Sequence, residues 1–547
     1  MRRSDSLYFP PVASNETPVL SSIFVGVQVY DGSGRPPFVT DVGTYRDRIA
    51  LVGDLSQRDA VSRIDCSRLA LAPGFIDVHS HSDELWLADG RALGKIMQGV
   101  TCEIGGNCGS SAAPLRGYAR ERKADEVKQL SLELGWSSFD EFFGAIERGG
   151  IALNVGSLVG LGTTRACIAG PDDRVLDANE LEAERTLVRE AVEQGAVGVS
   201  SGLIYEPGRY ADVTELAECA NAAARAGAPL YASHIRDEGD RLLEAVDEAL
   251  EVGARGDVAV QLSHHKAAWR RNWGKVHRSL ERIDRARSAG AAVGCDAYPY
   301  VAMWTDLDTI LPDDVRDGGP EKTLERLADP KTATATMLAL KMKYDAREWH
   351  DMLVTDVRSE RNAELAGLRV DEIAARRGVS PERAAVELLL EERLHVGCAF
   401  FAMSEDDVAT VYSAGFCAVA SDASARAYSG ITARGVPHPR TYGCFPRVFS
   451  RFVRTKKVLT IEEAVRRMTS LPATTFNLRG RGTIEPDAYA DLVVFDPERI
   501  ADRATYERPF EAPVGIAHVC VNGEFVVRDG VPTGRRPGRV LRGGGAS

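Results

Sequence analysis

Two histidines at the end of an apolar run are the residues of this chain best suited to hold an ion. In the run Phe75-Ile76-Asp77-Val78-His79-Ser80-His81, the two imidazoles stand two residues apart after β-branched residues. Residues i and i+2 of a strand point to the same side, so both rings can converge on one divalent metal ion. Two histidines in a surface loop would give the same pattern. Whether the pair binds a metal therefore depends on the residues at the ends of the other predicted strands.

Polar residues with ligand chemistry also follow other apolar runs. The candidates are His79, His81, Cys108 after Gly105-Gly106-Asn107, His234 in Ala232-Ser233-His234, His264 in Ser263-His264-His265, and Asp422 in Ser421-Asp422-Ala423. Taken singly, each could be a core histidine, a buried thiol or a helix N-cap. Six such residues at equivalent strand ends predict a metal site.

The types of ligand predict which metal this is. Histidine, cysteine and aspartate together favour zinc over magnesium, calcium or manganese. More than four ligands leave room for a second, weaker ion. No lysine occurs between Lys128 and Lys266, so a carboxylated lysine after the fourth strand is excluded as a bridge. Cys108 is the best candidate for a bridging ligand, with Glu206 behind it.

The middle of the chain alternates between apolar runs and amphipathic stretches. Besides the run ending at His79, strand-like runs occupy residues 99–104, 154–159, 196–200, 229–233, 258–263, 291–295 and 417–421. Helical stretches cover 181–194, 213–225 and 240–252, the last two ending at Gly227 and Gly253 as C-cap glycines would. About eight β-then-α units predict an α/β fold with a TIM-type (β/α)8 barrel; a doubly wound open sheet is the alternative.

The two ends of the chain and one interval near its C-terminal half differ from this alternation. Small β-sheets are predicted at both ends of the chain, from short alternating segments at 23–30, 48–52, 490–496 and 518–527. The last segment contains Asn522-Gly523, a typical β-hairpin turn. The interval from Tyr300 to Phe416 is charged and helical. We expect residues 1–70 and 481–547 to flank a barrel at 71–480, with a small, mostly helical insertion at about 302–400 before the last barrel strand.

Composition and charge indicate which kinds of partner the protein binds and in which compartment it lies. The net charge of −12 comes without a clustered basic stripe, which argues against nucleic acid and favours a small-molecule substrate. Ten cysteines without paired CxxC spacing indicate reduced thiols. Because neither a signal peptide nor an apolar run of membrane-spanning length is present, we expect a cytoplasmic protein. The oligomeric state stays open.

Several motifs taken together resemble the N-acyl-D-amino-acid deacylase (D-aminoacylase) family of the amidohydrolase superfamily. They are Pro73-Gly74-Phe75 through Asp83, Asn107-Cys108-Gly109, Ser201-Gly202-Leu203 through Gly208, Ser233-His234-Ile235-Arg236, His264-His265-Lys266, Ala297-Tyr298-Pro299 and Ser421-Asp422 with His438-Pro439-Arg440. The resemblance implies a (β/α)8 barrel plus a β-sandwich built from both chain ends. It also implies a tightly held zinc on Cys108, His234 and His264, and a weaker position near His79 and His81.

The activity that the resemblance implies is zinc-dependent hydrolysis of the amide bond of N-acyl-D-amino acids. A zinc-activated water would attack the carbonyl, and Asp422 would act first as general base and then as general acid. Lys266, Tyr298 and Arg440 would bind the substrate carboxylate. A cyclic-amide hydrolase of the hydantoinase or dihydroorotase kind and a zinc-binding, non-enzymatic scaffold are the alternatives. Residues 425–436 depart from the family pattern, which affects the acyl or side-chain pocket.

Overall fold

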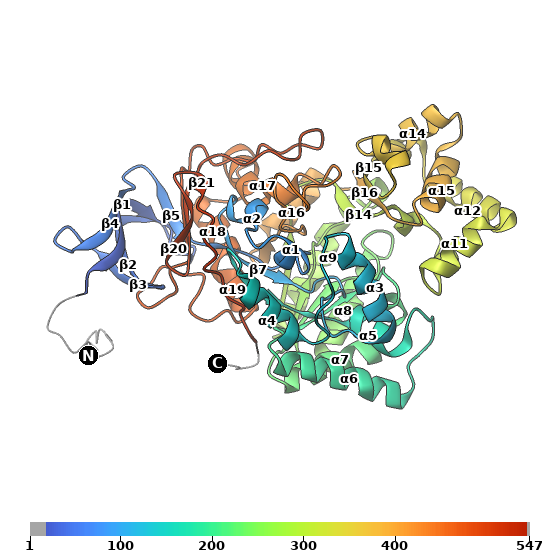
Figure 1. The fold of residues 1–547 in the computed structure, drawn as a ribbon, viewed down its shortest axis with the longest axis horizontal. Coiled ribbons are helices and arrows are strands. Elements are labelled where there is room, and N and C mark those ends of the chain that lie inside the picture. The colour runs from blue at the N-terminus through green and yellow to red at the C-terminus, as the bar shows by residue number, and fades with distance from the viewer. Residues whose placement is uncertain (1–17, 544–547) are drawn as a thin grey trace.

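The computed structural model describes residues 18–543 and shows three parts in a row (Figure 1). A β-sandwich that combines both chain ends lies at one end, the barrel lies in the centre, and the insertion with α11, α12, α14 and α15 lies at the opposite end. Within the described range, none of the helices is both long enough and apolar enough to cross a membrane.

The central part is a closed barrel of parallel strands. Its strands are β6 (Phe75–Asp77), β7 (Val100–Gly105), β8 (Asn154–Ser157) continued by β9 (Val159–Gly160), β10 (Val199–Gly202), β11 (Leu230–His234), β12 (Ala259–Leu262), β13 (Val293–Ala297) and β17 (Cys417–Val419). The ring closes after β17, where Asp422 N donates to His79 O at 2.8 Å and Ser80 pairs with Ala423. The predicted TIM-type barrel is confirmed, and the doubly wound open sheet is excluded.

Helices follow the barrel strands and cover the outside of the barrel. They are α1 (Leu85–Ala88), α2 (Leu93–Ile96), α3 (Gly117–Lys128), α4 (Phe139–Gly149), α5 (Leu161–Ala169), α6 (Ala178–Glu193), α7 (Val213–Arg225), α8 (Leu242–Gly256), α9 (Lys275–Ser288), α16 (Glu405–Ser413), α17 (Arg440–Arg447), α18 (Ile461–Met468) and α19 (Ser470–Thr475). Helix α7 begins where the Asp212 side chain accepts the amide of Glu215, an ordinary N-cap.

One predicted helix end is wrong. Helix α8 does not stop at Gly253 but continues to Gly256, and Asp257 follows in the left-handed region with φ of 54°. An added Cβ at Gly253 would overlap Val260 Cγ2 of β12. Gly253 is therefore needed for close packing of the helix on the strand, not for ending the helix.

The β-sandwich joins strands from both chain ends in one nine-stranded sheet. Its strands are β1 (Leu20–Val29), β2 (Phe38–Tyr45), β3 (Arg48–Gly53), β4 (Ala60–Asp65), β5 (Ala70–Pro73), β18 (Leu492–Phe495), β19 (Ile516–Val521), β20 (Glu524–Arg528) and β21 (Val531–Pro532). Strand β18 pairs antiparallel with β5 and so links the two ends. The rings of Phe24 on β1 and Phe525 on β20 lie 6.1 Å apart although β5, β18 and β19 separate their strands, so the sheet folds over onto itself.

The insertion contains a sheet that the sequence analysis did not predict. Strands β14 (Met303–Asp306), β16 (Val396–Phe400) and β15 (Met352–Val357) form an antiparallel sheet in that order. The helices are α10 (Asp313–Arg316), α11 (Pro320–Ala328), α12 (Pro330–Lys343), α13 (Ala346–His350), α14 (Val370–Arg377) and α15 (Pro381–Glu391). A separate apolar cluster that includes Trp349, Leu389 and Phe400 packs the helices on this sheet. The expectation of a mostly helical segment is therefore incomplete.

Candidate metal centre

The six predicted ligands lie at one mouth of the barrel. His79 and His81 follow β6, Cys108 follows β7, His234 ends β11, His264 follows β12, and Asp422 follows β17. All six positions are at the C-terminal ends of parallel strands, which meet at the same face of a barrel.

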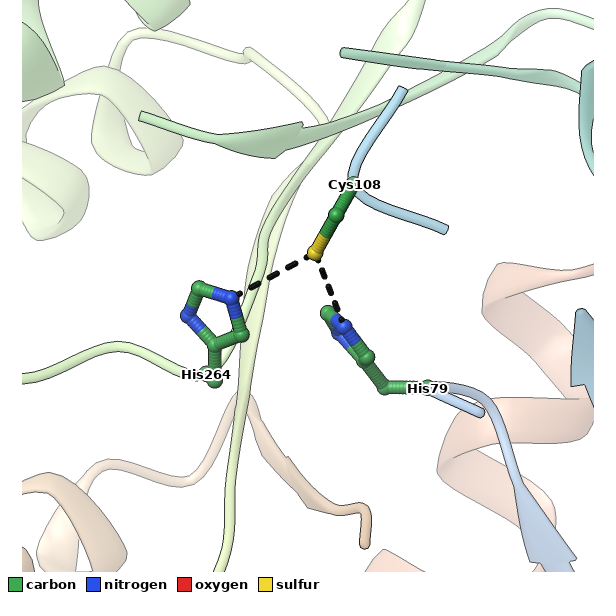
Figure 2. Close-up of side chains that lie close together, drawn as sticks. All are labelled: His79, Cys108 and His264. Carbon is green, nitrogen blue, oxygen red and sulfur yellow. Dashed lines mark hydrogen bonds between the residues drawn. The ribbon is translucent and has the colours of Figure 1, made fainter. Parts of the chain in front are cut away.

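The Cys108 sulfur points between two imidazoles, as Figure 2 shows. Cys108 Sγ lies 3.3 Å from His79 Nε2 and 3.5 Å from His264 Nε2. The same His264 Nε2 lies 3.0 Å from His234 Nδ1. His79, Cys108 and His264 therefore form one group of potential ligands, and His264 also belongs to a second group with His234 and Glu238.

Asp422 forms a third group of potential ligands with the histidines of the first strand. Its Oδ1 lies 3.1 Å from His81 Nε2 and 3.5 Å from His79 Nε2. His79 therefore belongs both to this group and to the group with Cys108 and His264, and the ligand atoms within each of these groups lie within 4.8 Å of one another.

The donor set and its ionisation fit zinc. Burial would raise the pKa of Cys108, but the nearby charges of His79 and His264 hold that pKa well below its ordinary value. The thiolate is the form that binds metal. Burial would lower the pKa values of His79 and His264, but neighbouring charges raise them, so a metal ion would have to displace their protons. A thiolate with the resulting neutral imidazoles is a ligand set typical of zinc.

The backbone is strained at three of the six positions. Cys108, His264 and Asp422 have φ of 51°, 35° and 50°, in the region that non-glycine residues rarely adopt. Such conformations cost of order 1–3 kcal/mol each and persist only where the surroundings enforce them. The strain turns these three side chains toward the centre of the mouth.

Two acidic residues at the site were not predicted from the sequence. Asp296 on β13 places Oδ1 3.2 Å from His79 Nδ1 and accepts the amide of His264 at 2.7 Å, so it orients two of the candidate ligands. Glu238 places Oε1 2.9 Å from His264 Nδ1. Asp296 could have been recognised as a site residue, because it is a charged residue inside an apolar strand. Nothing in the sequence around Glu238, four residues after His234, indicates a place at the site.

Two other residues lie away from the clusters. Glu206, the second candidate for a bridging ligand, pairs instead with Arg316 at 2.8 Å and Arg209 at 3.0 Å. Both contacts involve Glu206 Oε1, and the groups of potential ligands among the described residues do not include Glu206, so the structure does not bring it to the other candidates. His265 turns away from His264 and contacts Ser279 Oγ at 2.8 Å.

Comparisons with known proteins match this architecture over nearly the whole chain. A model described as amidohydrolase family matches residues 372–527. The N-acyl-D-glutamate deacylase of Alcaligenes xylosoxydans xylosoxydans is 38% identical over 96% of each chain. The chain belongs to the N-acyl-D-amino-acid deacylase family of the amidohydrolase superfamily. The D-aminoacylase of the same organism is 35% identical over 95% of this chain and 97% of its own.

A solved structure within the deacylase family agrees with the fold. The N-acyl-D-glutamate deacylase of Bordetella bronchiseptica, complexed with zinc and a phosphonate inhibitor that mimics the reaction's tetrahedral intermediate, superposes with a TM-score of 0.81. It is 36% identical and covers 96% of this chain and 100% of its own. The predicted barrel with an added β-sandwich is the fold of this deacylase family.

Three predicted substrate-binding residues of this deacylase-family chain lie together beside Asp422. The Tyr298 ring lies between Lys266 Nζ, 5.8 Å from its centroid, and the Arg440 guanidinium carbon, 4.5 Å from it. Arg440 Nη1 lies 2.9 Å from Asp422 Oδ2, and its Nε is buried without a hydrogen-bond acceptor among the described residues. Lys266 pairs with Glu238. Both cations therefore lie near the ring of Tyr298.

A buried ammonium group beneath the site holds the chain on both sides of Asp422. Lys95 Nζ donates to Ser421 Oγ at 2.7 Å and to Ala423 O at 3.0 Å, and its charge is balanced by Asp77 at 2.6 Å and Glu103 at 2.8 Å. Burial would lower the pKa of Lys95, but these two carboxylates raise it above its ordinary value, so the amine stays charged. The ammonium fixes the strained backbone at Asp422.

We expect Lys95→Met to destabilise the protein by about 3–5 kcal/mol, because it leaves two buried carboxylates without their cation. The measurement is the midpoint of chemical denaturation. Lys331→Met, at an exposed position of α12, is the matched control and should shift stability by less than about 0.5 kcal/mol. Equal midpoints for Lys95→Met and the unaltered protein would contradict this account of the network.

Two cavities meet at the metal centre. One of about 540 Å³ is lined by Lys266, Tyr298 and the aromatic residues Trp269 and Tyr344. Another of about 640 Å³ is lined by charged residues that include Arg440. Both cavities reach the same six residues: His81, Cys108, Tyr205, Trp304, Thr305 and Asp422. Two of these shared residues contact each other, with Tyr205 Oη 3.0 Å from Thr305 Oγ1.

Proposed function

We propose that this protein hydrolyses the amide bond of N-acyl-D-amino acids to a carboxylate and a D-amino acid, with zinc as its metal. The observation that carries the proposal is the convergence of Cys108, His234 and His264 at the barrel mouth, with Asp422 beside them, in a chain of the deacylase family. The Alcaligenes relatives are named for N-acyl-D-glutamate deacylase and D-aminoacylase activity.

The residues that would hold the metal separate into a tight and a weak group. Cys108, His234 and His264 combine a thiolate with two imidazoles and would hold zinc tightly. His79 and His81 with Asp422 would form a weaker second position. When bound, zinc supplies a Lewis acid for the amide carbonyl and lowers the pKa of water to about 7.

Asp422 would move the proton. Burial would raise the pKa of Asp422, but the guanidinium of Arg440 and the charges of His264 and His79 hold it well below its ordinary value. The ionised carboxylate takes the proton from the attacking water. It then returns this proton to the leaving amine nitrogen, so one group serves as base and then as acid.

Lys266, Tyr298 and Arg440 would hold the carboxylate of the D-amino acid. Lys266 and Tyr298 line the cavity with the aromatic walls, and Arg440 lies against the Tyr298 ring but lines the charged cavity, so the carboxylate would sit where the two cavities meet. If the carboxylate is bound there and the amide carbonyl is bound at the metal, the side chain on the Cα atom can point in one direction only. This three-point arrangement would select the D enantiomer.

The two alternatives are less well supported. A cyclic-amide hydrolase would be expected to carry a bridging lysine, which is absent between Lys128 and Lys266, and the named relatives act on linear N-acyl compounds. A non-enzymatic scaffold would not need Asp422, which lies against the candidate ligands and is held ionised.

A chirally resolved panel of N-acyl amino acids tests the proposed function. Purified protein, with its zinc content measured on the same sample, is assayed for amine release from matched N-acetyl-D- and N-acetyl-L-amino acids, and for ring opening of a hydantoin to the N-carbamoyl amino acid. We expect turnover of D substrates alone. Preference for the L series or for the hydantoin would overturn the proposal.

Lys266→Ala should weaken hydrolysis of carboxylate-bearing substrates by at least about tenfold in kcat/KM, because a charge-assisted bond is lost. The comparison substrate is the matched N-acetyl-D-amino acid amide, which lacks the carboxylate and should lose far less. Steady-state kinetics on both substrates gives the answer. Equal losses would remove Lys266 from carboxylate binding.

A further inference from the structure

The segment that departs from the family pattern places a guanidinium group in the charged cavity. Arg426 lines the cavity of about 640 Å³ that also reaches Cys108 and Asp422. Its Nη1 donates to Arg434 O at 3.0 Å, while its buried Nε finds no hydrogen-bond acceptor among the described residues. In that part of the chain no carboxylate oxygen lies within 4.0 Å of its guanidinium nitrogens. Arg426 as a whole is half-buried, but a guanidinium with a buried, unpaired nitrogen is stabilised by a ligand that supplies an anionic acceptor.

The backbone around Arg426 is held in place before any ligand arrives. Ala425 N donates to Ser82 Oγ at 2.7 Å, and Ala427 N donates to Thr432 Oγ1 at 3.0 Å. The carbonyl of Arg426 itself accepts the amide of Gly94 at 2.9 Å. A preorganised group loses little entropy when it binds.

The charges around Arg426 leave an excess of positive charge. Asp356 is the carboxylate that faces this region: burial raises its pKa, and the charges of Arg426, Arg434 and Arg358 act against that rise. Arg358 also faces Asp125, Glu126 and Asp306, so Arg426 and Arg434 are the two guanidinium groups left to share Asp356. Other carboxylates of the cavity have their own cations, since Glu126 pairs with Lys123 and Glu206 with Arg316.

Two more carboxylates of the same cavity belong to the insertion. Burial raises the pKa values of Asp306 and Asp308, and the charges of Arg122 and Arg316 oppose the respective rises. Asp306 also faces Arg358. Neither Asp306 nor Asp308 is among the charges that act on Arg426, so both leave the local excess at Arg426 in place.

The positions of the two cavities assign the halves of the substrate. Lys266 and Tyr298, which would bind the amino-acid carboxylate, line the aromatic cavity, whereas Arg426 lines the charged one. Arg440, the third residue of that carboxylate site, lines the charged cavity but contacts Asp422 at 2.9 Å, where the two cavities meet. Both cavities meet at Cys108 and Asp422, where the amide bond would be cleaved. The acyl half therefore extends into the charged cavity, toward Arg426.

We propose that Arg426 binds a terminal carboxylate on the acyl group, so that the preferred substrates are D-amino acids acylated by a short dicarboxylic acid. This inference rests on the proposed deacylase function and adds the chemical class of the acyl group to it. The Trp304 ring, which lies 5.4 Å from the Arg426 guanidinium carbon and lines both cavities, covers the acyl chain on its way to that carboxylate.

The test compares two acyl groups of the same size that differ in charge. N-succinyl and N-succinamoyl derivatives of one D-amino acid are assayed with the zinc-loaded full chain, with the N-acetyl derivative as a third substrate. We expect kcat/KM for the succinyl substrate to exceed that for the succinamoyl substrate by at least about tenfold. Arg426→Gln should bring this ratio close to one, and Arg426→Lys should keep part of it. Arg528→Gln, at an exposed position of β20, is the matched control and should leave the ratio unchanged.

The outcomes separate this inference from the function on which it rests. A ratio near one in the unaltered protein, or a ratio that survives Arg426→Gln, overturns the assignment of Arg426 while hydrolysis of the N-acetyl substrate leaves the deacylase function intact. If none of the D substrates is hydrolysed, both proposals fail. The comparison within the unaltered protein decides the question even if the variants fold poorly.

Discussion

Asp422→Asn is expected to lower kcat by about 10²–10⁴-fold, the usual contribution of a general acid–base group. Asparagine has nearly the same shape but can neither take the proton from water nor return it to the amine. Because Cys108, His234 and His264 are unchanged, zinc should remain bound. The measurements are kcat on an accepted N-acyl-D-amino acid and metal content by mass spectrometry on the same sample.

Asp406→Asn is the matched control for this variant. Asp406 is 92% exposed on α16, and its replacement should leave both kcat and metal content unchanged. An Asp422→Asn variant with kcat within about tenfold of the unaltered enzyme would show that the proton moves by another route. Full loss of zinc from the variant would instead make Asp422 a tight metal ligand, contrary to the proposed division.

Cys108→Ser is expected to abolish both tight zinc binding and activity. The pKa of the Cys108 thiol is held low by His79 and His264, whereas a serine hydroxyl stays protonated and is a poor ligand for zinc. We expect the zinc retained after dialysis against a chelator to fall from about one ion per chain to near zero. Elemental analysis and kcat measured before and after dialysis test this.

Cys167→Ser controls for the change of cysteine to serine. Cys167 is only partly buried and contacts Pro114 O at 3.4 Å, away from the barrel mouth. That variant should keep zinc and activity. A Cys108→Ser variant that still held one zinc after dialysis would contradict the role of the thiolate.

The barrel could be predicted because its signals are local. Each parallel strand is buried on both faces and therefore appears as a continuous apolar run, as in residues 229–233 and 258–263. Polar residues just after such runs, Asp422 among them, stand out against their surroundings. The family fold and the clustering of candidate ligands agree with that interpretation, whereas the roles of single residues and the boundaries at 70 and 480 stay predictions.

The features that were not predicted depend on contacts between distant parts of the chain. Strands β15 and β16 of the insertion pair across an interval that contains α14 and α15, so neither short run indicates its partner. Lys95 reads as an ordinary polar residue of a short helix, yet it is buried against Ser421 and Ala423. Asp296 becomes significant only through its contact with His79.

The central claim is that a thiolate and imidazoles from separate barrel strands bind one zinc ion. X-ray absorption at the zinc edge on the purified, unaltered protein tests it most directly. We predict one sulfur scatterer at about 2.3 Å together with nitrogen scatterers at about 2.0–2.1 Å. A spectrum with nitrogen and oxygen scatterers alone, or a protein that takes up no zinc at all, would contradict the claim.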